Sequence, residues 1–188
     1  MQINPNKYKK DWEKVTRLPK IEKVVVNFAL GRSGAELEKA RTLAEALTGR
    51  KPADSRARDN VRGFAIRKGE PIGCHVTLRG EEGIEFLKKA FYALDDKLLT
   101  KNFDQNGNVS MTIHDHLNLP GVKYDPKIGV FGFTVTANLE RQGYRVKRRR
   151  LLRKRVPQRH RISKEEAITW FLTNFNELKI QDRFEEDY

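Results

Sequence analysis

The chain has 188 residues, with 38 lysines and arginines against 25 aspartates and glutamates, so its formal net charge is +13. No apolar stretch approaches the ~20 residues that cross a bilayer, and the N-terminus lacks the apolar core of a signal peptide. A single cysteine, Cys74, cannot form an internal disulfide, which excludes a disulfide-stapled secreted scaffold. We therefore expect a soluble, intracellular, strongly basic protein of one domain or two small ones.

Runs of β-branched residues and turn signals predict the first elements of the chain. Residues 21–30 predict a buried strand. Ser33 followed by Glu36 is a capping-box pattern, which predicts the start of a helix, and Gly49 predicts its end. The apolar face of this helix is expected to consist of Leu37, Ala40, Ala44 and Leu47.

The middle of the chain predicts a loop, a strand and a second helix. The basic residues 50–60 predict an exposed loop, and residues 64–67 are expected to begin a strand. Residues 71–79 alternate in polarity and predict a strand, with Gly73, His75, Thr77 and Arg79 opposite its apolar face of Ile72, Cys74, Val76 and Leu78. The next helix is expected to begin at Glu81. Its apolar stripe is predicted to be Ile84, Leu87, Phe91, Leu94 and Leu98.

The remaining elements follow the same two periodicities. Asn106-Gly107 predicts a turn, and the alternating residues after it predict a strand. Residues 117–128 predict a loop, and a further strand alternates from Phe131 to Leu139. Ser163 and Glu166 form a second capping-box pattern before a final helix, and the acidic tail from Asp182 is expected to fray. The apolar residues of these elements are Val109, Met111 and Ile113, then Ala167, Trp170, Phe171, Phe175 and Leu178.

This order of elements predicts an α+β fold in which helices pack on one face of a mostly antiparallel sheet. We expect residues 1–140 to form the core and residues 141–161 to form a separate basic segment. Residues 162–181 are expected to hold a helix that packs on the core, and residues 182–188 a disordered acidic tail.

The positive charge is concentrated in two short segments. Residues 141–161 contain 11 lysines and arginines and no acid, and residues 50–68 contain 7 basic and 2 acidic residues. Like charges that cluster in this way repel one another unless a polyanion neutralises them. Arginine predominates in the later segment, and its planar fork fits phosphate and stacks on bases, which favours nucleic acid as the partner. A solvated face or a polybasic membrane tether is the alternative, although no lipidation motif accompanies the segment.

Other candidate sites are weak in this sequence. His114 and His116 would share one face of a strand, but no cysteine or histidine cluster at zinc spacing supports a metal site, so we expect surface or RNA-facing histidines. Cys74 lies on an apolar strand face and predicts core packing. Residues 31–34 lack the ending of a phosphate-binding loop and predict a turn. We therefore expect no catalytic residue, no metal and no cofactor.

Several stretches, taken in order, resemble one known family. They are Ile21–Asn27, Leu47–Pro52, Gly63–Gly69, Pro71–Gly80, Phe103–Asn108 and Tyr124–Pro126. Together they are similar to the ribosomal protein L5 family of the large subunit, which binds 5S ribosomal RNA, and the similarity extends from about residue 12 to 178. The basic segment and the run Arg161–Ala167 resemble the archaeal and eukaryotic branch.

The resemblance implies a structural, non-enzymatic role in cytoplasmic ribosomes. Family members hold 5S rRNA on an open sheet face and dock it in the central protuberance, where they contact P-site tRNA. The implied partners are 5S rRNA, large-subunit rRNA, P-site tRNA and neighbouring proteins of the central protuberance and the small-subunit head. The chain is expected to be a monomer in the ribosome with no membrane contact.

The resemblance also assigns residues to these partners. The positions implied to contact 5S rRNA are Asn27, Arg50, Phe64, Arg67, Thr77 and Arg79. Arg50 stands where the family commonly has glutamine, and we expect a phosphate contact there. The loop of residues 55–62 is implied to reach tRNA through Arg56, Arg58 and Arg62. The residues implied to bind large-subunit rRNA are Arg145, Lys147, Arg148, Arg149, Arg150, Arg153, Lys154, Arg155, Arg159 and Arg161.

Two other classes of function stay open at this point. An RNA-processing enzyme would have a basic substrate groove, but it also needs a catalytic acid, base or metal cluster. A non-ribosomal protein that compacts DNA or is tethered to a membrane would share the same charge pattern. Competition by duplex DNA or anionic vesicles separates this last class from an RNA-binding protein.

Overall fold

A computed structural model of the chain describes residue 8 and residues 11–175 and 177–182. The predicted acidic tail, residues 183–188, lies outside the described residues. The chain divides into two compact units, which we call the first and the second unit. The first unit comprises Met1–Lys23, Asp96–Ser110 and Ala137–Tyr188, and the second comprises Val24–Asp95 and Met111–Thr136.

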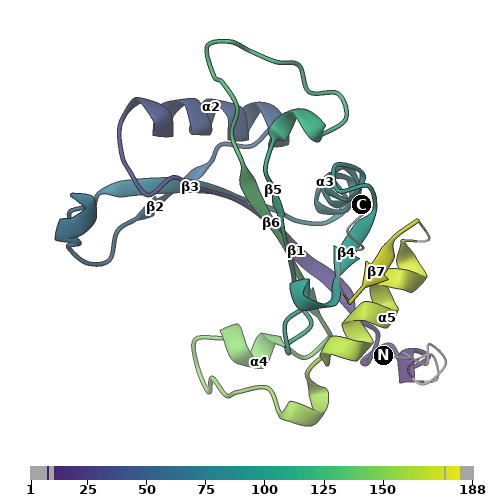
Figure 1. The fold of residues 1–188 in the computed structure, drawn as a ribbon. Helices are drawn as coiled ribbons and strands as arrows, with labels where there is room; N and C mark the ends of the chain where they lie inside the picture. Colours follow the sequence, from purple (N-terminus) through teal and green to yellow (C-terminus); the bar gives the residue numbers. More distant parts are fainter. Residues whose placement is uncertain (1–7, 9–10, 176, 183–188) are drawn as a thin grey trace. The chain divides into compact units, whose positions relative to one another are not determined.

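A five-stranded sheet forms the framework of the fold, with strand order β2-β3-β1-β6-β5 (Figure 1). Strand β3 pairs antiparallel with both β1 and β2. The predicted mixed fold with a mostly antiparallel sheet is thereby confirmed. The strands are β1 Lys20–Ala29, β2 Ala53–Arg56, β3 Pro71–Leu78, β5 Val109–Ile113 and β6 Phe133–Glu140.

In the second unit, two helices cover one face of β1 and β3. The helices are α2 (Ala35–Thr48) and α3 (Glu81–Tyr92). Helix α3 packs closely on β1, since a Cβ added to Gly83 of α3 would lie only 3.4 Å from the Val24 side chain. Arg41 of α2 forms an ion pair with Asp54 of β2, which pairs in register with the buried Cys74. The covered face carries residues that are almost completely buried: Val24, Val26, Phe28, Cys74, Val76 and Leu78.

The first unit is built around α5 (Lys164–Asn174) and a parallel pair of strands, β4 (Lys97–Leu99) and β7 (Lys179–Gln181). Aromatic rings contribute to its core. The rings of Phe103 and Phe171 pack edge to face, with their centroids 5.7 Å apart. The short helix α4 (Arg145–Arg148) belongs to the same unit. The short 3-10 helices of the two units are η1 Arg62–Phe64, η2 Thr100–Asn102, η3 His116–Asn118 and η4 Gln158–His160.

A buried ion pair anchors the N-terminal end of α5. Arg141 pairs with Glu166, and both side chains are less than a tenth exposed. The indole Nε1 of Trp12 also donates to Glu166, at 3.0 Å. The Ser163 hydroxyl accepts from the Glu166 backbone N–H and caps the helix. The predicted helix start is therefore confirmed, but the Glu166 carboxylate binds Arg141 and Trp12 as its own partners.

The other predicted capping box is wrong. The N-cap of α2 is Gly34, and no side chain caps it. The Ser33 hydroxyl instead donates to Glu70, which lies 37 residues further along the chain. The Ser33 side chain is thus engaged by a tertiary partner, and its oxygen accepts no hydrogen bond from the first turn of α2.

Three further predictions need correction. Part of the loop predicted over residues 50–60 is strand β2, which pairs with β3. The strand expected at residues 64–67 is absent, since η1 and a single bridge between Val61 and Ile66 close this segment into a turn. The helical stripe predicted through Leu98 is too long, because α3 ends at Tyr92 and Leu98 lies in β4.

The histidine prediction is wrong for one of its two residues. His114 is exposed, but His116 is only 2% exposed and lies in η3, outside the strand. The Phe131 backbone N–H donates to His116 Nδ1 at 3.4 Å. A buried polar ring needs such a partner, and this contact fixes His116 as part of the packing.

The predicted Asn106-Gly107 turn is confirmed, and it is tightly packed. Gly107 has φ +80, and a Cβ added there would lie 2.7 Å from Ile162 Cγ2. Gly121 has a similar φ of +83, but a Cβ there meets nothing within 4 Å. The two glycines thus share the backbone conformation and differ in packing.

Gly107→Ala is expected to lower the free energy of unfolding by about 2–4 kcal/mol, because it combines left-handed strain with overpacking. Gly121→Ala is the matched control and should cost about 1–2 kcal/mol from strain alone. Urea denaturation of the two variants measures the difference. Equal losses would show that the contact with Ile162 does not constrain the turn.

Candidate nucleic-acid interface

The face of the sheet opposite α2 and α3 carries short polar side chains. In the antiparallel register, Asn27 lies opposite His75, and Val25 lies opposite Thr77. Residues opposite one another share a face, and this face alternates with the buried one. Ser55 of β2 joins it, with its hydroxyl oxygen 3.0 Å from His75 Nδ1. We call Asn27, Ser55, His75 and Thr77 the polar sheet face; all four are half-buried.

Of the predicted 5S-binding residues, the structure brings Asn27 and Thr77 together on the polar sheet face. Arg79 follows directly after β3 and is exposed. Arg50 is placed elsewhere, because it forms an ion pair with Glu82 in the first turn of α3, at 2.7 Å. That partner raises the pKa of the Arg50 guanidinium through a hydrogen bond. The expected phosphate contact of Arg50 therefore competes with a carboxylate of the protein.

A second surface lies at the end of the β2–β3 hairpin, which projects beyond the strands in the second unit (Figure 1). We call residues 57–70 the hairpin loop. Its backbone is cross-linked, since the Ala57 N–H donates to Glu70 and the Gly69 N–H to Ala57, at 2.8 and 2.9 Å. Phe64 at this end is 76% exposed. Exposed cations also lie in or beside the loop: Arg56, Arg58, Arg62 and Arg67.

Glu70 holds the base of the hairpin loop. It accepts from the Ser33 hydroxyl and, at 3.0 Å, from the Arg67 backbone N–H. These bonds hold the pKa of the Glu70 carboxyl below its usual value, and the bond from Ser33 has the largest effect. The loop therefore presents Phe64 and Arg67 from a defined conformation. They lie in the hairpin loop with Arg58 and Arg62, two of the predicted tRNA-contacting arginines, whereas the third, Arg56, ends β2. The polar sheet face is formed by the strands.

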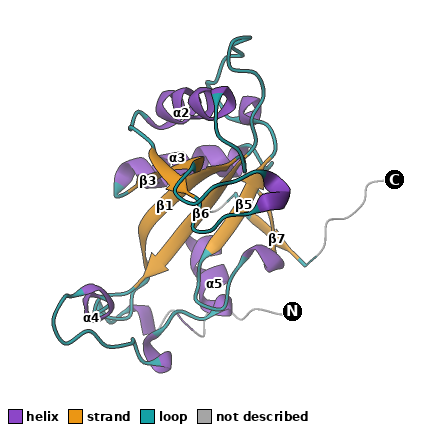
Figure 2. Cartoon of the chain, turned by 90° about the vertical axis from the view of Figure 1, so that its left-hand side faces the viewer, coloured by secondary structure: helices purple, strands orange, loops and turns teal. Residues whose placement is uncertain are grey.

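The third surface is the segment of residues 141–161, which we call the basic loop; Figure 2 shows it around α4. Two of its arginines are bound by acids of the same unit. Arg141 pairs with Glu166, and Arg148 pairs with Glu140 and, at 2.7 Å, with Glu22. Both carboxylates raise the pKa of Arg148, with Glu140 having the larger effect. Arg148, predicted to bind rRNA, thus also fastens the basic loop to the first unit.

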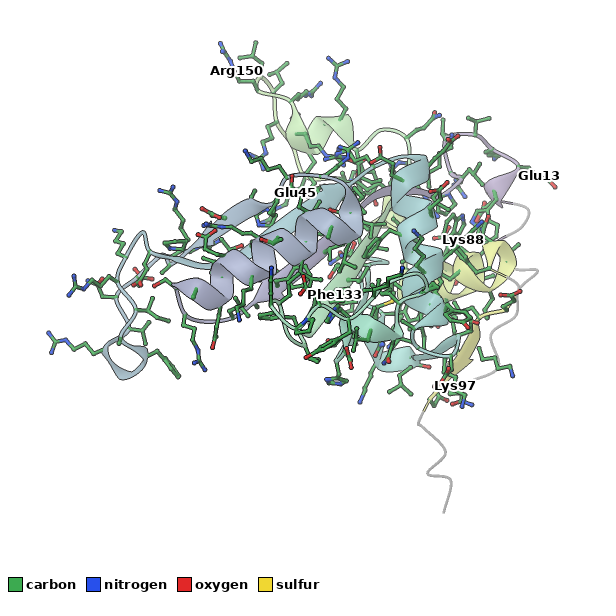
Figure 3. The ribbon with its side chains drawn as sticks, turned by 90° about the horizontal axis from the view of Figure 1, so that it is seen from above. Glu13, Glu45, Lys88, Lys97, Phe133 and Arg150 are labelled. Atoms are coloured by element: carbon green, nitrogen blue, oxygen red, sulfur yellow. The ribbon has the colours of Figure 1, made fainter. Side chains whose placement is uncertain are left out.

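The other cations of the basic loop are available to a partner. Figure 3 shows Arg150 at the outer end of the loop, pointing away from the ribbon. The Arg149 guanidinium donates to the Leu152 carbonyl, and the Arg161 Nε donates to the Val156 carbonyl. Within the described part of the chain, no acid pairs with Arg145, Lys147, Arg149, Arg150, Arg153, Lys154, Arg155, Arg159 or Arg161.

Evidence for other kinds of site is lacking in the part of the chain that the structure describes. No group of three or more histidines, cysteines or acids there is arranged to hold a metal ion. None of its helices is both long and apolar enough to span a membrane. The predicted packing of Cys74 is confirmed, since the residue is fully buried and burial raises the pKa of its thiol.

Sequence reasoning missed Ser55 as a member of the polar sheet face. Ser55 falls within the basic stretch of residues 50–60, which the sequence predicts to be an exposed loop entered through Pro52. The antiparallel pairing with β3 is what places it beside His75. The available signal was the predicted strand at residues 71–79. A strand that pairs with one neighbour still has a second edge, and a short polar strand can pair there.

Comparison with known proteins matches nearly the whole chain to one family. Residues 14–67 match the family model described as ribosomal protein L5, and residues 71–170 match the ribosomal L5P family C-terminus. The large ribosomal subunit protein uL5 of Sulfolobus acidocaldarius is 45% identical over 164 residues, which cover 87% of this chain and 92% of that protein. The uL5 protein of Pyrobaculum aerophilum is 47% identical over 151 residues, which cover 80% of this chain and 84% of that protein.

The anchoring role of Arg148 leads to a test on the basic loop. Glu22→Gln removes one of its charged partners. A partly exposed ion pair contributes about 0.5–1 kcal/mol, so trypsin should cleave the loop about 2–5-fold faster. The matched control is Glu45→Gln, which removes the same charge from α2, where Glu45 has no ion-pair partner among the described residues (Figure 3). Equal cleavage rates in the two variants would show that Glu22 does not hold the loop.

Proposed function

The chain belongs to the ribosomal protein L5 family of the large ribosomal subunit, and on that premise we propose that it binds 5S rRNA on the polar sheet face and anchors it to large-subunit rRNA. Proteins of this family are structural constituents of the ribosome, so the chain is not an enzyme. Its RNA-binding role in translation follows from the family. The finer assignment to 5S rRNA is what the family resemblance implies, and the geometry of the sheet supports it.

The observation that carries the proposal is the pairing of Asn27 with His75 and of Val25 with Thr77 on the face opposite the helices. Backbone hydrogen bonds hold these short side chains at fixed spacing. Folded RNA offers ribose 2′-hydroxyls and phosphate oxygens, and a rigid array of small donors and acceptors recognises their arrangement. Arg79, at the end of β3, adds a cation beside this array.

The hairpin loop is proposed to contact P-site tRNA. Arg56, Arg58 and Arg62 are exposed, and charge-based contacts with a phosphate backbone tolerate any sequence. Such tolerance suits a partner that changes with each round of translation. The small-subunit head and neighbouring proteins of the central protuberance are the further partners that we propose for the chain as a monomer in cytoplasmic ribosomes.

The basic loop is proposed to attach the complex to large-subunit rRNA. Its unpaired cations lie on a segment that Arg148 and Arg141 fasten to the first unit. Ordered cations lose less conformational entropy on binding than those on a free tail. The same arrangement would also bind other polyanions, and the experiment must therefore separate shape recognition from charge.

Gel shifts with purified 5S rRNA over a salt series test the proposal. Thr77→Val and Asn27→Leu each remove hydrogen-bonding groups at nearly constant volume and should weaken binding about 5–10-fold. Because neither substitution changes the charge of the protein, the slope of affinity against salt concentration should not change. Thr42→Val is the matched control, since Thr42 is exposed on α2, where its hydroxyl donates to the Glu38 carbonyl.

Excess tRNA and duplex DNA serve as competitors in the same experiment. Binding that survives both competitors and falls in the two sheet variants supports the proposal. If the sheet variants match Thr42→Val and every nucleic acid competes equally, the cations alone drive binding, and the assignment to 5S rRNA is wrong.

A further inference from the structure

A polar pocket lies within the first unit and shares no residue with the polar sheet face. Its volume is about 300 Å³, at the lower end of the ~300–1,000 Å³ typical of small-ligand sites. The turn at residues 106–108, the end of β6 and the basic loop form its walls. The lining residues that matter for its chemistry are Asn106, Asn108, Asn138, Tyr144, Lys147 and Arg155.

Asparagine side chains supply this pocket with amide groups that can bond to a ligand. The side-chain amide nitrogens of Asn106 and Asn108 both donate to the Asp104 carboxylate, at 3.2 and 3.3 Å. These bonds lower the pKa of the Asp104 carboxyl, and the bond from Asn106 has the largest effect. Each amide has two N–H groups, so each keeps one N–H and its carbonyl oxygen for a ligand.

Asn138 supplies the most specific signal. Its Oδ1 is buried and accepts no hydrogen bond from any residue that the structure describes. Buried polar atoms are almost always hydrogen-bonded, so an unpaired acceptor in the wall of a pocket indicates a donor supplied by a bound molecule. Asn138 alternates along β6 with the buried Ala137 and Leu139, which fix its position.

The rim of the pocket is positively charged. Lys147 and Arg155 form no ion pair with the residues that the structure describes. Glu140, the acid in the lining, is already bound by Arg148. Tyr144 adds a half-buried aromatic side chain, and burial raises the pKa of its phenol, which keeps it neutral.

A ligand of this pocket must combine negative charge with hydrogen-bond donors. Phosphate alone would satisfy the cations but leave the amide oxygens without donors. A basic peptide would supply donors but be repelled by Lys147 and Arg155. A nucleotide has both, because its phosphate is an anion and the exocyclic amino group of its base donates.

We propose that this pocket binds one nucleotide of an RNA partner, extruded from its stack, whose base carries an exocyclic amino group. Asn138 accepts from that amino group, and Lys147 and Arg155 bind the adjoining phosphate. The inference rests on the proposed RNA-binding function, but it assigns a base-reading site to a part of the chain for which the family resemblance implies only binding to large-subunit rRNA.

Nucleotide titrations of the full-length protein, followed by NMR or calorimetry, test the inference without any mutation. AMP should bind at least 5-fold more tightly than purine riboside 5′-monophosphate, which lacks only the amino group, and more tightly than ribose 5-phosphate or inorganic phosphate. Equal affinity of AMP and ribose 5-phosphate would overturn the inference, because it would show binding of the phosphate alone.

Variants then locate the site. Asn138→Leu should remove the preference for AMP over purine riboside 5′-monophosphate. Arg155→Met should weaken both nucleotides, whereas Arg153→Met, an exposed cation of the same loop outside the pocket lining, should not. If Arg155→Met and Arg153→Met have equal effects, the nucleotide is held by general charge, and the pocket assignment is wrong.

Gel shifts with 5S rRNA on the same samples keep the two proposals distinguishable. Normal 5S binding without a preference for AMP would overturn the pocket and leave the sheet proposal standing. A preference for AMP that depends on Asn138, found together with sheet variants that bind 5S rRNA normally, would support the pocket and contradict the sheet proposal.

Discussion

Backbone pairing between β1 and β3 fixes the chemistry of both faces of the sheet in the second unit. The register places Val24 opposite Leu78 and Asn27 opposite His75. A slip by one residue would move every side chain of a strand to the other face, which would expose the apolar set and bury the polar one. The helices α2 and α3 need the apolar face for packing, so the burial of Val24 and Val26 specifies where Asn27 and Thr77 lie. The proposed RNA surface is thus a consequence of core packing.

Charge in this protein serves two purposes that the sequence alone does not separate. Arg41, Arg50, Arg141 and Arg148 each bind a carboxylate of the same unit, and the Arg141–Glu166 pair is almost completely buried. Removing one partner of such a buried pair leaves an unpaired charge, which makes Arg141 a structural residue. The exposed cations of the basic loop remain for polyanions. Acids such as Glu22 and Glu140 therefore contribute to the proposed RNA-binding surface, because they pair with Arg148 of the loop.

The elements that depend on periodicity were predictable, and those that depend on distant contacts were not. Strands β1, β3, β5 and β6 alternate clearly, and their buried residues agree with the prediction except in β3, where Gly73 is buried and Ile72 is only half-buried. Strands β2 and β7 are short and polar, so only their partners reveal them. The end of α3 was missed because Asp95 and Asp96 take left-handed conformations, with φ of 53° and 56°, which apolar spacing does not reveal. For the site, alternation predicts the sheet face on which Thr77 lies. The ion pair of Arg50 with Glu82 and the unpaired side-chain oxygen of Asn138 depend on residues distant in sequence, so only the structure reveals them.

Crosslinking of the intact chain to 5S rRNA that contains 4-thiouridine tests the central claim most directly, because it needs no substitution in the protein. Mass spectrometry of the crosslinked peptides identifies the surface that the RNA contacts. The account predicts crosslinks to β1 and β3 at residues of the polar sheet face, including Asn27 and Thr77. Crosslinks confined to the hairpin loop and the basic loop, with none to these two strands, would contradict it.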